Sequence, residues 1–593
     1  MNKKLQRILP KVQKPARYTG GEFGQIIKNP DEIEYKMALC FPDTYEIGMS
    51  NLGMRILYGV ANGLSGIYCE RVFSPWTDME EQMREENIPL WTLESGEPLL
   101  SADLIAFSVG YEMSYTNILN MLDLAKIPLR SGDRGEDFPL VIAGGTACVN
   151  PEPMAEFFDL MVMGEGEEVL AELLELFKSC KKEGISKAEQ IKKSAEIQGV
   201  YAPALKLNKK ITKRIIEDFS NSYFPTDTII PSTEIVQDRV SLELFRGCMR
   251  GCRFCQAGFA YRPVRMRDEE KIIEQGVKSL EFSGHQEVTL SSLSSSDYPP
   301  LADLCEELMQ YCEPKSISLS LPSLRADNFS MDIMQNVQKV RKGGLTFAPE
   351  AGSQRLRDAI NKNVTEEELL QSCKVAFEGG YSSVKLYFML GLPTETDEDV
   401  IAIADLAHEV LHTWRLYAKN KNRGLRITVS TSCFIPKPHT PFQWEPQVSR
   451  EEYLRRVSLL RESITAKSVT YNWHDADTSL IEAVLSRGDR RLSDVIERVW
   501  EKGGRMESWS EHFDLNRWLE AFSELDIDPH YYANRERSFD EKLPWDFIDL
   551  GVDKTFLWRE RERCYQSVLT PDCRTKCTGC GANRFLDGRV CNA

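Results

Sequence analysis

Two series of short apolar runs, separated by amphipathic helical patterns, constrain the fold of this chain more than any other feature. In the first series the runs lie at 35–42, 66–73, 104–110, 139–145 and 159–164, and in the second near 239–245, 286–291, 316–320, 344–349, 383–389 and 425–432. Strands that alternate with helices form parallel sheets. We therefore predict an α/β protein with a doubly wound, Rossmann-like N-terminal domain and a partial barrel of six βα units.

The domain boundaries that we predict follow these two series. The 593 residues suffice for about three domains. Residues 1–178 are predicted to form the Rossmann-like domain, 179–235 a connector rich in Lys, Glu, Ser and Pro, and 236–444 the barrel. Residues 445–593 are predicted to form a mixed, mainly helical C-terminal region that ends in a cysteine-rich tail.

Composition excludes several classes of protein. The sequence has no run of about 18 apolar residues, so we expect no membrane span. The basic N-terminus lacks the apolar core of a secretion signal, so we expect a cytoplasmic protein. The 16 cysteines of such a chain are then expected to be reduced or bound to metal. The net charge of −17 argues against a general nucleic-acid-binding surface.

Three cysteines follow the first apolar run of the second series, in the stretch FRGCMRGCRFCQAGF. Cys248, Cys252 and Cys255 are spaced CxxxCxxC. Iron–sulfur clusters are normally held by four Cys thiolates, so a loop with three leaves one iron open to a small molecule. The alternative is a structural zinc knuckle, which needs four N or S ligands; the nearest downstream candidate is His285. The spacing favours an open 4Fe–4S cluster.

A second cysteine group lies in DCRTKCTGC, near the end of the chain. Cys573, Cys577 and Cys580 are close enough in sequence to hold one metal centre, with Cys564 or Cys591 as a fourth ligand. The group predicts either a second iron–sulfur cluster or a tetrahedral zinc site. The alternative is a mobile tail that carries reduced thiols.

Together these motifs give the chain a resemblance to a known class of enzymes. The chain resembles an uncharacterised family of radical S-adenosylmethionine (SAM) proteins with an N-terminal cobalamin-binding-like domain, over nearly its whole length. The resemblance implies that Cys248, Cys252 and Cys255 are the catalytic ligands of a cluster that reductively cleaves SAM to a 5′-deoxyadenosyl radical. It also implies that Phe254 lies against the adenine, for which core packing is the alternative.

Later turns of the barrel fit the same resemblance. Glu350, Gly352 and Ser353 in FAPEAGS, and Gly391 and Pro393 in LGLP, are implied to touch SAM, although Ser353 is also a suitable helix cap. SCFIPKPHTPFQW at 432–444 resembles the same region of radical SAM methylthiotransferases. Ser291, Ser292, Ser294, Arg325 and Lys385 are expected to face the barrel mouth, and Arg325 and Lys385 are candidates for contact with substrate or SAM. The six arginines between Arg246 and Arg267 are candidates for contact with an anionic substrate or with the SAM carboxylate.

The N-terminal domain departs from the cobalamin-binding pattern at one position. Cobalamin modules often carry DxHxxG, whereas this chain has Asp43, Tyr45 and Gly48, with Tyr45 in the His position. All seven histidines lie at or after His285, so no histidine of this domain can bind cobalt. Ser108, Gly144, Gly145 and Gly164 match the rest of the pattern. The resemblance implies bound cobalamin; the alternative is a vestigial module that supports the barrel or binds a partner.

These observations lead to one main functional hypothesis and two alternatives. The main hypothesis is a cobalamin-dependent C-methyltransferase, or a related radical enzyme, that acts on an unknown substrate with a one-electron donor such as flavodoxin or ferredoxin. The first alternative is a cobalamin-independent, methylthiotransferase-like modification of RNA or a ribosomal protein. The second is a sensor that holds a cluster or cobalamin without turnover.

Overall fold

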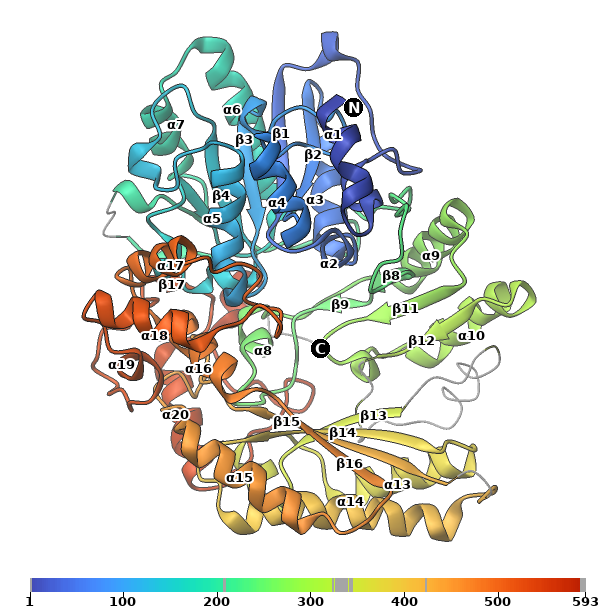
Figure 1. The fold of residues 1–593 in the computed structure, drawn as a ribbon. Helices are drawn as coiled ribbons and strands as arrows, with labels where there is room; N and C mark the ends of the chain where they lie inside the picture. The colour runs from blue at the N-terminus through green and yellow to red at the C-terminus, as the bar shows by residue number, and fades with distance from the viewer. Residues whose placement is uncertain are drawn as a thin grey trace.

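The computed structural model describes residues 3–205, 209–322, 325, 340, 345–421 and 424–586. The N-terminal sheet with its helices occupies the top of the view in Figure 1, and the barrel strands lie below it in two groups. The C-terminal helices lie along one side and contact both parts. No helix in these ranges is both long and apolar enough to cross a bilayer.

The N-terminal domain is a doubly wound sheet. Its strand order is β2-β1-β3-β4-β5-β6; the first five strands are parallel, and β6 is antiparallel to β5. All five predicted strands are present, and the bounds are β1 (Tyr35–Phe41), β2 (Ile67–Phe73), β3 (Leu104–Ser108), β4 (Leu140–Gly144), β5 (Leu160–Val162) and β6 (Val200–Tyr201). The order of strands therefore reverses next to β1, with β2 on one side and β3 on the other. Doubly wound sheets bind ligands at such a switch point, beyond the carboxyl ends of the strands.

Both faces of this sheet are covered, because successive side chains of a strand point to opposite faces. On β1, Met37 and Leu39 pack with α3 (Leu52–Gly63) and α6 (Gly166–Glu183). Ala38 and Cys40 pack on the other face with α4 (Thr77–Glu86) and α5 (Tyr115–Leu124). The boundary predicted at residue 178 falls inside α6, and β6 adds part of the predicted connector to the sheet.

The barrel consists of two parallel groups of strands. The first has the order β12-β11-β8 and the second β13-β14-β15-β16. The bounds are β8 (Val240–Glu243), β11 (Glu287–Ser291), β12 (Ser318–Ser320), β13 (Leu345–Glu350), β14 (Ser383–Leu390), β15 (Arg426–Cys433) and β16 (Val469–Trp473). The six predicted strands are all present. A seventh, β16, pairs with β15 beyond residue 444, where we predicted the barrel to end.

Helices cover the outer face of each strand group. They are α9 (Glu269–Ser283) and α10 (Leu301–Cys312) on the first group, and α13 (Glu366–Glu378), α14 (Asp397–Tyr417) and α15 (Arg450–Ser463) on the second. On β14, Val384 and Leu386 are buried against these helices, whereas Lys385 and Tyr387 are exposed on the opposite face. The concave side of the second group is therefore open.

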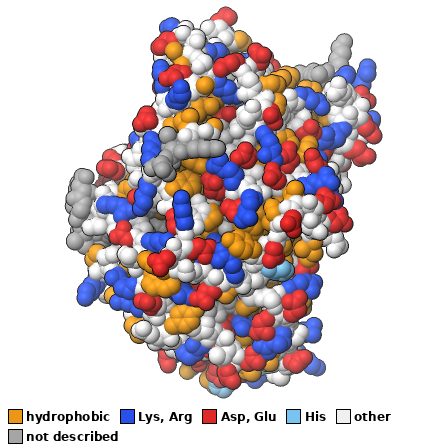
Figure 2. Space-filling model, turned by 90° about the vertical axis from the view of Figure 1, so that its left-hand side faces the viewer, with side chains coloured by type: hydrophobic (Ala, Val, Ile, Leu, Met, Phe, Trp, Pro, Cys, Tyr) orange, Lys and Arg blue, Asp and Glu red, His pale blue; other side chains and the backbone are white. Residues whose placement is uncertain are grey.

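Four of the C-terminal helices share a core with the N-terminal domain. Residues of α16 (Ala476–Arg487), α17 (Leu492–Glu501), α18 (Leu515–Glu524) and α19 (Pro529–Ala533) share one hydrophobic cluster with α4 and α5. Figure 2 shows acidic and basic side chains intermixed on the side of the molecule that includes these helices. The described residues of that face therefore do not form the single-sign basic patch that is typical of a nucleic-acid-binding surface.

Candidate functional site

The loop that carries Cys248, Cys252 and Cys255 connects β9 (Phe245–Arg246) to α8 (Gln256–Ala260). Gly247, before Cys248, has φ +89°, and a Cβ there would lie 2.6 Å from the carbonyl oxygen of Pro263. Only glycine fits this turn. At the other end of the loop, the Cys255 thiol caps α8 by accepting a hydrogen bond from Gly258 N at 3.3 Å. The loop is thus held at both ends.

The three thiols lie near one another. Burial raises the pKa of Cys248 to about 11 and that of Cys255 to about 12, and the nearby Cys252 thiol contributes to both shifts. Thiols of this kind give up their protons when they bind a metal centre. In the parts of the chain described above, no three His, Cys, Asp or Glu side chains are already arranged around a metal ion. The fit to a cluster rests on three soft donors carried by one short loop.

A polar group lies beside this loop. Glu350, at the end of β13, has φ +70° and accepts a hydrogen bond from Lys362 Nζ at 3.0 Å. Burial lowers the pKa of Lys362, but Glu350 and the Cys252 thiol outweigh this effect, and the net shift is upward. Arg325 Nη2 donates to the Lys362 carbonyl at 2.8 Å. Sequence reasoning selected Glu350 and Arg325 and missed Lys362, which lies in no recognisable motif.

Other residues predicted to touch SAM contact the protein itself. A Cβ at Gly352 would lie 2.4 Å from Ile403 N, so this glycine allows the turn to pack against α14. Ser353 caps α12 (Gln354–Ala359) by accepting from Leu356 N at 3.1 Å, and its hydroxyl donates to Asp399. Phe254 packs against a hydrophobic cluster that contains Phe434. These are the packing and capping roles given above as alternatives.

The remaining predicted barrel residues are dispersed. Gly391 N donates to the buried Glu395 carboxylate at 2.7 Å, and Pro393 follows in the same turn. The Ser294 hydroxyl donates to Asp297 at 2.7 Å. Lys385 is exposed on the concave face of β14. Of this group, none but Ser291 and Ser292 lines the large cavity described next.

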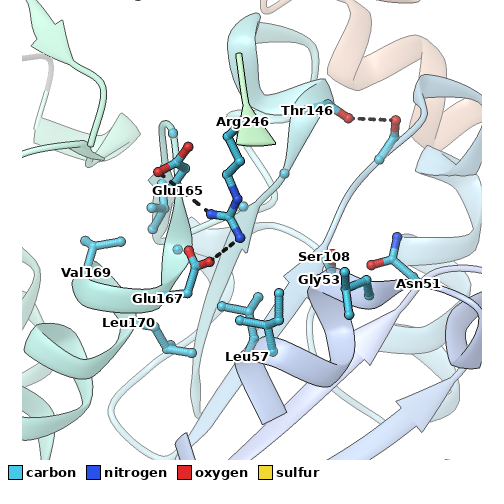
Figure 3. Close-up of a pocket in the computed structure, with 18 of the residues that line it drawn as sticks. Asn51, Gly53, Leu57, Ser108, Thr146, Glu165, Glu167, Val169, Leu170 and Arg246 are labelled. Carbon is cyan, nitrogen blue, oxygen red and sulfur yellow. Dashed lines mark hydrogen bonds and ion pairs between the residues drawn. The ribbon is translucent and has the colours of Figure 1, made fainter. Parts of the chain in front are cut away.

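A cavity of about 480 Å³ lies between the N-terminal domain and the barrel. Four of the predicted cobalamin-site residues line it: Ser108, Gly144, Gly145 and Gly164. Figure 3 shows apolar side chains of α3 and α6, including Leu57, Val169 and Leu170, around its interior. The barrel contributes Arg246, Gly247 and Tyr261, so the cavity extends to the residue before Cys248.

The three residues of the predicted DxHxxG-like segment lie away from this cavity. Asp43 accepts a hydrogen bond from Trp509 Nε1 at 3.0 Å, and Tyr45 is buried and donates its hydroxyl to Glu22 at 2.9 Å. A Cβ at Gly48 would lie 2.2 Å from the Phe73 ring. Asp43, Tyr45 and Gly48 do not line the cavity. Their contacts are with the C-terminal region and the domain core.

Arginines and glutamates join the two domains at the cavity wall. Arg246 reaches Glu167 at 2.7 Å and Glu243 at 2.9 Å, and Figure 3 shows it directed toward Glu165 and Glu167. Arg265 binds both oxygens of Glu165, at 2.6 and 2.7 Å. Burial raises the pKa of Glu165, but Arg265 outweighs it, and the net shift is downward. Sequence reasoning did not identify the ion pairs that the GEGEE segment (164–168) forms with these two arginines.

All six arginines expected to contact an anionic ligand have partners within the protein. Their partners are Glu167 for Arg246, Asp297 for Arg250, Glu560 for Arg253, the Gly258 carbonyl for Arg262, Glu165 for Arg265, and Gln275 for Arg267. Arg246, Arg253 and Arg265 therefore join the barrel to the other domains, whereas the partners of the other three arginines lie within the barrel.

The C-terminal cysteines lie next to the loop that carries Cys248, Cys252 and Cys255. Cys573, Cys577 and Cys580 line a small cavity, and Cys573 N donates to the Met249 carbonyl at 3.1 Å. Of the two candidate fourth ligands, Cys564 is buried in a different hydrophobic cluster from Cys580, and Cys591 lies outside the described residues.

Two family models match the chain. Residues 242–407 match the radical SAM superfamily, and residues 53–203 match the N-terminal region of radical SAM proteins. The chain therefore contains a radical SAM domain, preceded by the N-terminal region found in radical SAM proteins. A radical SAM domain implies a 4Fe–4S cluster and SAM as cofactors, in agreement with the cysteine loop after β9.

Individual relatives cover different parts of the chain. An uncharacterised protein of Methanocaldococcus jannaschii is 27% identical over 468 residues, which is 78% of this chain and 90% of that protein. The threonylcarbamoyladenosine tRNA methylthiotransferase of Aquifex aeolicus is 29% identical over 236 residues, which is 38% of this chain and 53% of that enzyme.

Two solved structures resemble the chain at low identity. TsrM, a radical SAM methyltransferase of Kitasatospora setae with cobalamin and a [4Fe–4S] cluster bound, has a TM-score of 0.47 and 14% identity over 67% of this chain and 74% of that chain. OxsB, a cobalamin-dependent SAM radical enzyme with aqua-cobalamin bound, has a TM-score of 0.46 and 13% identity over 84% of this chain and 72% of that chain.

Proposed function

We propose that this chain is a cobalamin-dependent radical SAM enzyme that transfers a methyl group to carbon, or carries out a related radical modification. The observation that carries this proposal is the cavity that runs from the carboxyl edge of the N-terminal sheet to Gly247, next to Cys248. Ligands of doubly wound sheets bind at this edge. A group bound there would lie beside the catalytic loop.

The cavity wall suits a large, flat and partly apolar ligand. Gly145 and Gly164 have φ of +117° and +103°, and a Cβ at either residue would overlap a carbonyl oxygen of the protein. Together with Gly144, they leave bare backbone at the rim. Below the rim, Leu57 and Leu170 give an apolar interior. Neither His nor Cys occurs among the described residues that line the cavity.

The residues around the cavity would position the cofactors and exclude water. When bound, a reduced cluster with SAM supplies a carbon radical, and cobalamin supplies a methyl group. The apolar side chains of α3 and α6 would shield the reacting centre from solvent. The Arg265–Glu165 pair would hold the cavity rim of the N-terminal domain in a fixed position relative to the barrel.

Cobalamin binding can be tested with a cavity-filling variant. A Cβ at Gly144 would lie 3.7 Å from the nearest atom, so Gly144→Leu leaves the backbone unstrained while its side chain fills the cavity. After anaerobic reconstitution, we expect the wild type to show cobalamin absorbance and the variant to lose at least about 90% of it. Tyr45→Phe is the control and should retain cobalamin. Equal binding by all three proteins would contradict the proposal.

The reaction class can be tested by product analysis. Methyl transfer predicts both 5′-deoxyadenosine and S-adenosylhomocysteine from SAM in the presence of a one-electron donor such as flavodoxin or ferredoxin. Cys252→Ala should abolish 5′-deoxyadenosine formation, because it removes a predicted cluster ligand. Failure of the reduced, reconstituted wild type to cleave SAM would contradict radical chemistry and favour a sensor.

The second candidate function is cobalamin-independent modification of RNA or protein. It is supported by the identity with a tRNA methylthiotransferase over 38% of this chain. Because the methyl of a methylthio group also comes from SAM, a methylthiotransferase-like reaction likewise yields 5′-deoxyadenosine and S-adenosylhomocysteine, but it predicts no cobalamin uptake. The cobalamin absorbance measurement above therefore separates the two functions.

A further inference from the structure

The C-terminal tail runs along the back of the catalytic cysteine loop. Three contacts hold it there: Cys573 N donates to the Met249 carbonyl at 3.1 Å, Arg574 Nη1 donates to Asp297 at 3.1 Å, and Arg253 Nη2 donates to the Val568 carbonyl at 2.7 Å. Asp297 is also the partner of Arg250, which lies between Cys248 and Cys252. Arg574 of the tail and Arg250 of the catalytic loop therefore share Asp297 as a partner.

Arg262 lies between the two cysteine groups. It is 4% exposed, and its Nε and Nη2 donate to the carbonyls of Gly258 and Arg250 at 3.0 and 2.7 Å. Its Nη1 is also buried and has no well-aligned hydrogen bond within the described residues, and the weak acceptor beside this guanidinium is the Cys580 thiol. The thiols that interact electrostatically with this guanidinium are those of Cys580, Cys573 and Cys248. A buried N–H without a partner is costly unless a bound acceptor satisfies it.

The tail cysteines repeat the spacing of the catalytic loop. Cys573, Cys577 and Cys580 are spaced CxxxCxxC, as are Cys248, Cys252 and Cys255. They surround a small cavity. Gly579 and Gly581, with φ of +69° and +98°, allow the backbone to turn tightly on both sides of Cys580.

We propose that Cys573, Cys577 and Cys580 bind a second iron–sulfur cluster, packed against the back of the catalytic cysteine loop, with Arg262 Nη1 donating to one of its sulfur atoms. The repeated spacing favours iron–sulfur over zinc, because a structural zinc site needs four ligands. Cys564, the candidate fourth ligand within the described residues, packs in a separate cluster. Cluster binding would fix the tail, and through it the loop.

Iron analysis tests this proposal without reference to cobalamin or to turnover. After anaerobic reconstitution we expect about eight irons per chain, from two 4Fe–4S clusters. A variant with alanine at Cys573, Cys577 and Cys580 should fall to about four, and so should one with alanine at Cys248, Cys252 and Cys255. Only the tail variant should keep the electron paramagnetic resonance signal that shifts when SAM is added.

Two further variants distinguish loss of the second cluster from misfolding of the tail. Cys577 is exposed, so Cys577→Ser should leave the circular dichroism unchanged while it lowers the iron content. Thr578→Ala, in the same loop, should keep about eight irons. An iron content that the tail variants do not change, or stoichiometric zinc that only they lose, would overturn the proposal. Either result leaves the proposed function standing, because cobalamin uptake and SAM cleavage are measured separately.

Discussion

At the scale of single residues, the arginines after β8 show how a residue type can suggest the wrong partner. An arginine run next to a cluster motif is well suited to bind an anion, and the sequence offers no means of telling which carboxylates will be nearby. Arg265 meets Glu165, which is 100 positions away in the chain, and Arg253 meets Glu560, 307 positions away. Neither pairing is visible in sequence spacing.

The Arg265–Glu165 pair gives a prediction about stability. Both side chains are about 95% buried and bind each other through two hydrogen bonds. Glu165→Gln should lower the free energy of unfolding by about 3–5 kcal/mol, because it leaves the guanidinium buried with a weaker partner. Glu168→Gln is the control: Glu168 pairs with Arg214 at an exposed position, and its loss should cost less than about 1 kcal/mol. Urea unfolding measures both.

The acid dependence of this pair has a definite sign. Arg265 holds the pKa of Glu165 below its ordinary value despite burial. The pair therefore stabilises the protein fully at pH values above the ordinary pKa of a glutamate, and this stabilisation is lost as the pH falls through the lowered pKa. The difference in stability between wild type and Glu165→Gln should therefore shrink toward low pH. A difference that grows as the solution becomes more acidic would contradict this account.

Tyr45 provides a second prediction at this scale. Its hydroxyl donates to Glu22, which also pairs with Arg71 at 2.9 Å in the domain core. Tyr45→Phe should cost about 1 kcal/mol, the usual value of one hydrogen bond. Tyr45→His should not create a cobalt ligand, because the side chain points into the core rather than the cavity. An altered cobalamin spectrum in Tyr45→His would show that this position faces the ligand.

At the scale of elements, the strands and helices of both α/β domains were predictable because their patterns are local. The five N-terminal strands and the six barrel strands lie where period and turn residues place them. β16 was missed, because four of its five residues are polar or aromatic and none is fully buried. Its pairing with β15, rather than its own pattern, makes it a strand.

Helix α17 gives an element-scale prediction. Ile496 is fully buried in the cluster that α17 shares with α5 of the N-terminal domain. Ile496→Ala should cost about 2–5 kcal/mol, because it leaves a cavity between the two elements. Glu501→Ala, at the exposed end of the same helix, should cost less than about 1 kcal/mol. Both effects should appear in the transition that unfolds the N-terminal domain; a separate transition for the C-terminal helices would contradict the shared core.

At the scale of the whole molecule, contacts between domains create the site. The cavity needs α3 and α6 from one domain and Arg246, Gly247 and Tyr261 from the other. His439, which follows β15, joins the same two domains: it is buried, and its Nε2 lies 3.0 Å from the Val149 carbonyl. Each domain alone would leave these surfaces open to water.

His439 predicts how this arrangement responds to acid. Burial lowers the pKa of His439 to about 4, so the folded protein binds fewer protons than the unfolded chain between about pH 6.5 and 4. Its contribution is fully present above about pH 6.5, and about 3 kcal/mol of it should be lost as pH falls toward 4. His439→Asn, which tolerates the φ of +59° here, should show a shallower pH dependence of unfolding. An unchanged dependence would contradict this assignment.

The sequence by itself determined the α/β class, the positions of the strands along the chain and the two cysteine groups, because these depend on periodicity and spacing within a few residues. Only the tertiary structure decided which predicted residues share a site. It placed Ser108, Gly144, Gly145 and Gly164 at one cavity, and it placed Asp43, Tyr45 and Gly48 in packing contacts. The physical reason is that a cavity wall, a buried ion pair and a cysteine tail behind a loop each join segments hundreds of residues apart, and their contacts depend on how the domains pack.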